Sequence, residues 1–183
     1  MIFVALIHYP VLNRHGDVIN SAVTNLDMHD ISRAARTYGV KRYYVVTPLP
    51  DQQQLAADLA GHWLHGTGGE KNPDRKNALG IMKITDSLES AVADIAGITG
   101  QKPEIYATSA MERVKSVSWE EMREKIKQDD RPFLLIFGTA SGLADEIIEK
   151  TDGIISPIKG PTEYNHLSVR SAASITLDRL LGR

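Results

Sequence analysis

The chain has 183 residues, 42% of them hydrophobic and 24% charged, with a formal net charge of −2. These values are ordinary for a soluble protein, and the length favours one domain over residues 1–183 rather than two. The absence of cysteine excludes disulfides, thiolate metal sites and a cysteine nucleophile. The slight negative charge argues against a protein that coats nucleic acid through a large basic excess.

The N-terminal run Ile2 to His8 is apolar and predicts a buried first strand. It is too short to span a membrane, and it lacks the basic start and the small-residue cleavage site of a signal peptide. We therefore expect a cytoplasmic protein that does not act at a membrane.

The next elements alternate between helix and strand. Helical spacing predicts a helix over residues 25–38 that ends at Gly39. β-branched and aromatic residues predict a strand over residues 41–47, which Pro48 and Pro50 terminate. This order is typical of the start of an α/β fold.

A helix over residues 51–65, capped by Asp51, is expected to follow. Glycine and proline in residues 66–74 predict a long loop. Further strands are expected at residues 80–85, 104–107, 133–137 and 153–156, and further helices at residues 87–96 (capped by Asp86 or Ser87), 118–128 (capped by Ser118, with Glu121 three residues on), 143–150 and 167–181. The alternation predicts a mostly parallel sheet with helices on both faces, and it leaves the strand order open.

Three polar or glycine-bearing segments directly follow predicted strands. They are Thr108-Ser109-Ala110, Gly138 to Gly142, and Ser156 to Gly160, the last leading into Asn165 to Ala173. In open α/β sheets, ligands bind beyond the carboxyl ends of the strands. These segments therefore predict a crevice rich in backbone donors and acceptors, which suits a planar group with polar edges such as adenine.

These segments resemble the three cofactor loops of the SPOUT methyltransferases, the α/β-knot enzymes that use S-adenosylmethionine, mostly on RNA. Residues 25–40 also resemble the first motif of the SpoU/TrmH branch, in which an Asn and, six positions on, a catalytic Arg open a helix ending in Gly-Val. Arg33 falls on the Arg position, and Gly39-Val40 on the helix end. Asp27 replaces the Asn, which is a departure from the pattern.

The resemblance implies a C-terminal trefoil knot, an S-adenosylmethionine cofactor held mainly by backbone contacts, and a homodimer. It also implies methylation of an RNA, tRNA or rRNA, on a ribose 2′-oxygen or, as in the TrmD branch, on a base nitrogen. A non-catalytic RNA-binding or assembly protein on the same scaffold is the alternative. A small-molecule α/β enzyme with an unrelated ligand is a weaker third interpretation.

The resemblance also gives candidate cofactor-binding residues. Backbone groups of Gly138, Ser156 and Ile158 would bind the adenine and ribose edges, and the side chains of Ile155, Ile158 and Leu167 would sandwich the ring. Glycines would let the backbone approach the ligand, or would serve only tight turns. The full candidate set is Thr108, Ser109, Gly138, Gly142, Ile155, Ser156, Ile158, Gly160, Asn165, Leu167 and Ser168.

Arg33 is the first candidate for catalysis. By resemblance it would contact an RNA phosphate and help to deprotonate a ribose 2′-hydroxyl; the alternative is a surface pair with Asp30, three residues back. Asp27, His29 and Asp30 are possible proton acceptors. Of these, His29 alone titrates near neutral pH without help, and it can equally be a partly buried histidine without a chemical role.

Three further basic residues are candidates for binding an anion. His166 and Arg170 lie four apart at the predicted entry of the last helix, where they would share a face and line the methionine carboxylate or a subunit interface. Arg14 could reach phosphate or lie in a plain exposed turn. The spacing of His62 and His65 matches no zinc motif, and we expect no metal.

Overall fold

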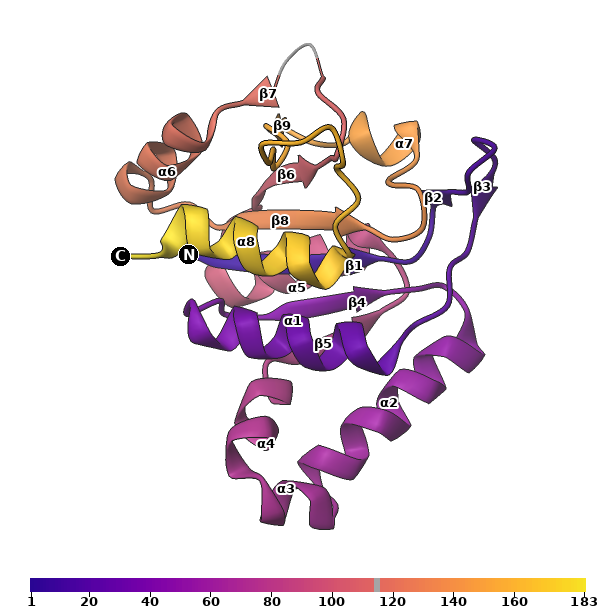
Figure 1. Ribbon diagram of the computed structural model, residues 1–183. Helices are drawn as coiled ribbons and strands as arrows, with labels where there is room; N and C mark the ends of the chain where they lie inside the picture. Colours follow the sequence, from indigo (N-terminus) through magenta and orange to yellow (C-terminus); the bar gives the residue numbers. More distant parts are fainter. Residues whose placement is uncertain (114–115) are drawn as a thin grey trace.

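The computed structural model describes residues 1–113 and 116–183. Its centre is a seven-stranded sheet in the order β5-β4-β1-β8-β6-β9-β7 (Figure 1). All pairings within this sheet are parallel across the described residues. The strands are β1 (Ile2–Ile7), β4 (Tyr43–Val46), β5 (Met82–Thr85), β6 (Glu104–Thr108), β7 (Ser116–Val117), β8 (Phe133–Gly138) and β9 (Gly153–Ile155).

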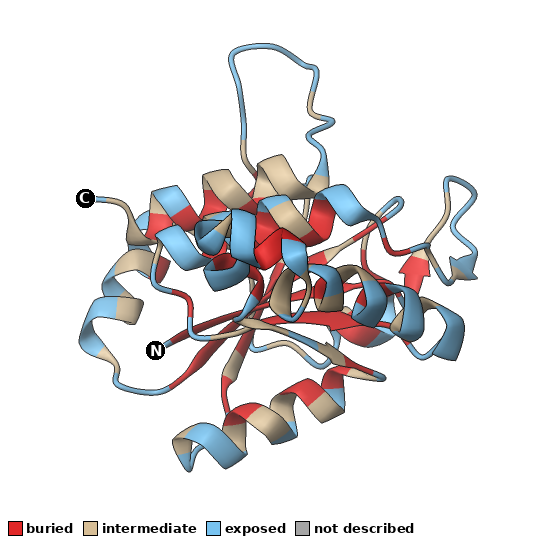
Figure 2. Cartoon of the chain, turned by 90° about the horizontal axis from the view of Figure 1, so that it is seen from below, coloured by how far each residue is buried: buried red, intermediate tan, exposed pale blue. Residues whose placement is uncertain are grey.

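Helices cover both faces of this sheet and form two separate cores. One core joins the strands to α1, α2, α6 and α8, and the other joins them to α5 and α7. Buried residues gather in the central strands and on the helix sides that face them (Figure 2). The helices are α1 (Asn25–Thr37), α2 (Pro50–Leu64), α3 (Thr67–Lys71), α4 (Pro73–Leu79), α5 (Leu88–Thr99), α6 (Trp119–Gln128), α7 (Asp145–Ile148) and α8 (Val169–Leu181). The predicted α/β class is confirmed.

The central strands are continuous apolar runs because both of their faces are covered. All six residues of β1 are buried, and so are Phe133 to Phe137 of β8. β8 lies between β1 and β6, so the chain inserts this later strand between two earlier ones. From there it crosses to β9 on the far side of β6 and returns through a long connection to α8.

The glycine-rich segment predicted as a loop is helical, so that prediction was wrong. Residues 67–71 form α3 and residues 73–79 form α4, with the Asn72 side chain accepting a hydrogen bond from the Arg75 backbone N–H at the start of α4. Gly68 and Gly69 are buried, and a Cβ on Gly69 would lie 2.0 Å from the Trp63 carbonyl oxygen. Here glycine permits close packing of α3 on α2 rather than a flexible turn.

Two predicted helix starts were also wrong. Pro50 is the first residue of α2, so Asp51 lies in its first turn and does not cap it. The last helix begins at Val169, which leaves His166 outside it. The expected caps Ser87 and Ser118 are confirmed, and Ser118 forms a full capping box with Glu121.

An antiparallel hairpin after β1 was not foreseen. Its strands are β2 (Val11–Leu12) and β3 (Val18–Ile19). The Asn13 side chain closes the turn by accepting hydrogen bonds from the backbone N–H groups of His15 and Asp17. Within the described residues, no helix has the length and apolar character needed to cross a bilayer.

Candidate active site

The three segments after β6, β8 and β9 meet at the carboxyl edge of the sheet, as predicted. The Thr108 hydroxyl donates to the Ile136 carbonyl at 3.1 Å and thereby joins the ends of β6 and β8. The Asn165 side-chain amide donates to the Ala110 carbonyl at 2.8 Å, and it joins the segment before α8 to the one after β6. Polar groups far apart in sequence therefore line one edge.

The segment after β8 is a tight turn that needs two glycines. A Cβ on Gly138 would lie 2.7 Å from the Leu143 backbone nitrogen, so the returning chain itself requires glycine there. Gly142 has a φ of +118°, a conformation that other residues rarely adopt, and no atom lies within 4 Å of where its Cβ would be. Gly142 thus leaves open space beside its backbone. Gly160 also faces open space, but neither strain nor crowding requires glycine at that position.

The segment after β9 corrects part of the predicted cofactor contacts. The Ile155 side chain is buried in the core with α1 and α8, so it is not free to cover a ligand. The Ser156 N–H already donates to the Val117 carbonyl at 2.9 Å. Ile158 is half-buried and Leu167 is 46% exposed. These two side chains are the apolar groups of the predicted sandwich that remain available.

Three predicted polar contacts have partners within the chain. The Asn165 side-chain amide donates to the Ala110 carbonyl, and the Ser109 hydroxyl accepts a hydrogen bond from the Met111 N–H at 3.1 Å. The Ser168 hydroxyl accepts from the Ser171 N–H at 3.3 Å as the cap of α8. These side chains shape the loops and leave backbone groups as the main ligand donors and acceptors.

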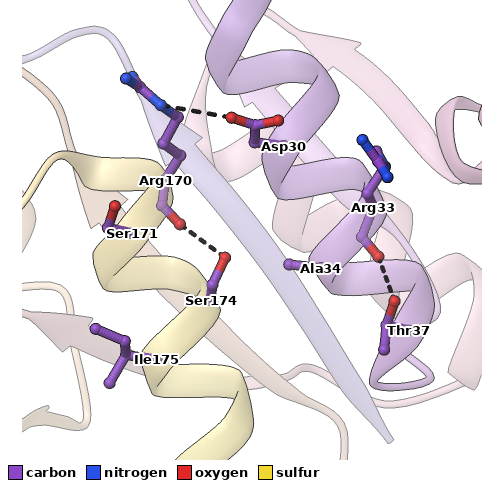
Figure 3. A pocket seen from close by; sticks show the side chains of 8 residues that line it. All are labelled: Asp30, Arg33, Ala34, Thr37, Arg170, Ser171, Ser174 and Ile175. Carbon is purple, nitrogen blue, oxygen red and sulfur yellow. Dashed lines mark hydrogen bonds and ion pairs between the residues drawn. The ribbon is translucent and has the colours of Figure 1, made fainter.

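A shallow groove of about 580 Å³ lies between α1 and α8. Arg33 lines it from α1, and Figure 3 shows its guanidinium directed away from the pair formed by Arg170 and Asp30. Arg33 is exposed and has no ion-pair partner among the described residues, so its predicted alternative pairing with Asp30 is not formed. The arginine is therefore available to an anion from outside the chain.

Asp27 is buried and already has two partners. Its Oδ2 accepts a hydrogen bond from the Thr24 hydroxyl at 2.7 Å, and its Oδ1 lies 3.3 Å from Nη1 of Arg170. The same guanidinium lies 3.5 Å from Asp30 through its Nε. Arg170 therefore ties the first turn of α8 to α1, and Asp27 contributes to packing rather than standing free as a proton acceptor.

Unlike Asp27, His29 faces α2 and α4. Its ring meets Trp63 edge-on at a centroid distance of 5.4 Å. Burial lowers the pKa of His29, and the nearby charges of Arg75 and Arg33 lower it further. A neutral imidazole can accept a proton, but Asp27 is held by Thr24 and Arg170, whereas His29 packs against Trp63.

A buried polar chain at the ends of β1 and β8 was missed by sequence reasoning. The Thr139 hydroxyl donates to the Ile7 carbonyl at 3.0 Å and lies 2.5 Å from the Ser21 hydroxyl. Ser21 lies 3.0 Å from Nδ1 of His8, whose side chain is fully buried. Burial lowers the pKa of His8 to about 4, so it is neutral at physiological pH. The one signal in the sequence was a histidine ending an apolar strand.

The described residues contain no group of three or more His, Asp or Glu side chains placed to hold a metal ion.

Tyr164 is 75% exposed in the segment before α8, and its ring lies 5.4 Å from that of His166. The site is therefore made of backbone groups and hydroxyls, with a few exposed apolar side chains.

A parallel sheet with late strand insertion and polar loops at its carboxyl edge defines an open α/β protein with a ligand crevice at that edge. Its fold resembles the A. aeolicus TrmH/SpoU tRNA modifying enzyme, with a TM-score of 0.56 at 17% identity over 99% of this chain and 73% of that one. At this identity the likeness establishes the fold alone.

The chain belongs to a family of SAM-dependent RNA methyltransferases, whose model matches residues 1–182. The predicted family and its cofactor, S-adenosylmethionine, are thereby confirmed. A relative from Oleidesulfovibrio alaskensis, named tRNA (guanine-N(1)-)-methyltransferase, is 44% identical over 99% of this chain, which spans 42% of that relative's length. An uncharacterised Aquifex aeolicus protein is 35% identical over the whole chain and 89% of its own length.

The residues at the carboxyl edge fit S-adenosylmethionine. Gly142 and Gly160 leave space beside the backbone, where a planar group can approach closely. Leu167 and Ile158 offer apolar surface to an adenine ring. Backbone N–H and C=O groups suit the polar edges of adenine and ribose, and these backbone groups are uncharged.

Proposed function

We propose that this protein transfers the methyl group of S-adenosylmethionine to a tRNA, with the ribose 2′-oxygen as the favoured acceptor. The cofactor supplies an activated methyl group that any well-aligned nucleophile can displace. The tRNA assignment draws on the named relatives, and the methyl donor on family membership.

The observation that carries the proposal is the free guanidinium of Arg33. It lies exposed in a groove without an acid partner among the described residues, where a phosphodiester can reach it. A guanidinium binds phosphate through two parallel hydrogen bonds and fixes its orientation. Arg33 would thereby hold the acceptor nucleotide and lower the cost of removing the 2′-hydroxyl proton.

The ribose acceptor follows from the match of Arg33 to the catalytic arginine of the SpoU/TrmH branch. Asp27 does not separate the two acceptors, because a guanine N1 and a ribose 2′-hydroxyl must both lose a proton and the Asp27 carboxylate is already bound to Thr24 and Arg170. A base nitrogen stays the second candidate because of the name of the Oleidesulfovibrio alaskensis relative. rRNA in place of tRNA would change the substrate but not this chemistry.

Modified-nucleoside analysis tests the proposal. tRNA and rRNA from a strain lacking the protein are digested and compared by mass spectrometry with RNA from the wild type. We expect one methylated nucleoside to disappear and to return with the wild-type gene but not with Arg33→Ala. A 2′-O-methyl nucleoside supports the ribose acceptor, and 1-methylguanosine the base nitrogen. An unchanged profile would instead support a non-catalytic RNA-binding or assembly protein.

We infer further that residues 1–183 form one domain with a C-terminal trefoil knot and that two copies associate. The insertion of β8 between β1 and β6, followed by the return of the chain to α8 beside Ala110, supports the knot. Arg33 lies eight residues into α1, about 12 Å along the helix from its start at the carboxyl edge. A second copy would bring this arginine to the partner's cofactor loops.

Light scattering tests the association. We expect twice the mass of one chain, and a stable monomer that transfers methyl groups would contradict the dimer. The absence of a membrane-spanning helix among the described residues is compatible with the cytoplasmic location that we propose.

A further inference from the structure

The helices α1, α3 and α4 carry basic side chains that lack acidic partners. Elsewhere in the described chain most lysines and arginines pair with a carboxylate, as Arg42 and Lys83 do with Asp94. In the same part of the chain, no acid lies within ion-pair distance of the side chains of Arg33, Arg36, Lys71, Arg75 and Lys76. The acids of α3 and α4, Glu70 and Asp74, also have no ion-pair partner among the described residues. Five unpaired bases against two unpaired acids leave these helices locally positive, although the whole chain is slightly acidic.

Arg75 is held in a defined position on this surface. Its guanidinium lies 4.5 Å from the centre of the Trp63 ring, a cation–π contact that joins α4 to α2. Trp63 in turn meets His29 and His62 edge-on. This contact restricts the position of the guanidinium, so less conformational entropy is lost when Arg75 binds a ligand.

Arg75 and Arg33 act on the same region. α1 and α4 pack directly against each other. Arg33 lies four residues after His29, on the same face of α1, and Trp63 contacts both His29 and Arg75. The pKa of His29 falls mainly through burial, and both guanidinium charges lower it further, which requires both to lie near the ring. The Asp30 carboxylate also lies near His29 and raises its pKa, but Asp30 is paired with Arg170. Both Arg33 and Arg75 therefore stay available to a bound anion.

We propose that Arg75, stacked on Trp63, and Arg33 form a two-arginine clamp for an RNA phosphodiester, so that the helices α2 to α4 are an RNA-binding arm. This inference rests on the proposed function, because the RNA it would bind is the methyl acceptor. The successive charges of an RNA backbone match a surface that continues through Arg36, Lys71 and Lys76, whereas a single small anion needs only the clamp. Figure 1 shows these helices projecting beyond the β5 end of the sheet, where a long ligand can reach them.

The test is tRNA binding by Arg75→Gln, which keeps a polar planar group over Trp63. Fluorescence anisotropy with unfractionated bacterial tRNA is measured over a series of salt concentrations for the wild type, Arg75→Gln and Arg75→Ala. Lys102→Ala is the matched control, because Lys102 is exposed and has no ion-pair partner among the described residues. It lies before β6, which three strands (β4, β1 and β8) separate from β5. Urea unfolding checks that each variant is folded.

We expect Arg75→Gln to weaken tRNA binding roughly five- to thirtyfold at moderate salt and to reduce the slope of log affinity against log salt by about one. Lys102→Ala should change neither. S-adenosylmethionine binding, measured by calorimetry, should stay within about twofold of the wild type. In methyl transfer, KM for tRNA should rise more than kcat falls.

Wild-type tRNA affinity and salt slope in folded Arg75→Gln would overturn the clamp, even if the wild type methylates tRNA normally. If that variant lost binding to polyglutamate and not to tRNA, the surface would serve an acidic protein, and the RNA assignment would be wrong. If the wild type bound no S-adenosylmethionine, the proposed function would fail, yet the salt slopes would still decide whether the clamp binds RNA.

Discussion

Arg170 joins α8 to α1 through two carboxylates. Its guanidinium lies 3.3 Å from Asp27 and 3.5 Å from Asp30. Arg170 lies in the first turn of α8, directly after the loop that leads from β9. Removal of Arg170 leaves the buried Asp27 carboxylate without its cation. An unpaired buried charge lowers the stability of the folded protein, whereas an unpaired exposed charge has little effect on it.

We therefore expect Arg170→Ala to lower the free energy of unfolding by about 1–3 kcal/mol. Arg14→Ala, in the exposed hairpin turn, should change it by less than about 0.5 kcal/mol. Urea unfolding measures both. Equal stability of the two variants would show that the junction does not depend on this ion pair.

His8 makes stability depend on pH. Its pKa in the folded protein is about 4, below the 6.5 of a free histidine, because burial disfavours the charged ring. The unfolded chain therefore binds this proton more readily between those two values. The contribution of a neutral His8 is fully present above pH 6.5 and is lost as pH falls towards 4.

The wild type should lose about 2 kcal/mol of stability through this group between about pH 7.5 and about pH 5. In His8→Gln, which does not titrate, the loss over the same interval should shrink by that amount. Urea unfolding at the two pH values gives the comparison. An identical pH dependence in the variant would mean that His8 titrates normally in the folded state.

At the scale of elements, Ser168 and Ser118 perform the same task at the starts of α8 and α6. Each hydroxyl accepts a hydrogen bond from the backbone N–H three residues on. Alanine at either position should cost about 1 kcal/mol of stability. Because the Ser168 hydroxyl is already engaged as a cap, we expect Ser168→Ala to change S-adenosylmethionine affinity no more than Ser118→Ala does. A tenfold selective loss in calorimetry for Ser168→Ala would show instead that its hydroxyl binds the cofactor, as the sequence suggested.

Regular elements were predictable where local physics decides them. The run Phe133 to Phe137 predicted a buried central strand, and Ser118 with Glu121 predicted a helix start. The error at Gly68 and Gly69 has a physical cause, since these glycines serve close packing on Trp63, and packing partners are not encoded in local spacing. The strand order, the junction at Arg170 and the polar chain from His8 to Thr139 arise from tertiary contacts and could not be foreseen.

The candidate site was predictable in outline and not in detail. The sequence correctly placed three polar segments at one edge of the sheet, because parallel strands end on the same side. It did not foresee that Thr108, Asn165 and Ser168 would use their side chains to hold the loops. It also grouped Asp27 with His29, although residues two apart on a helix face different neighbours.

At the scale of the whole molecule, two regions of the fold are expected to cooperate. The carboxyl edge offers neutral backbone groups to the methyl donor, and the surface of α1 and α4 offers free positive charge to a phosphate backbone. This separation would allow a chain with a net charge of −2 to bind RNA as proposed, since the unpaired bases of α1, α3 and α4 outnumber the unpaired acids of these helices.

The most direct measurement is a calorimetric titration of the folded protein with S-adenosylmethionine. The carboxyl-edge loops predict saturable binding of one molecule per chain. A bulky side chain placed in the open space beside Gly160, as in Gly160→Trp, should abolish this binding while leaving the unfolding transition in place. If no heat of binding appears at millimolar cofactor, or if Gly160→Trp binds as the wild type does, the loops do not form the cofactor site.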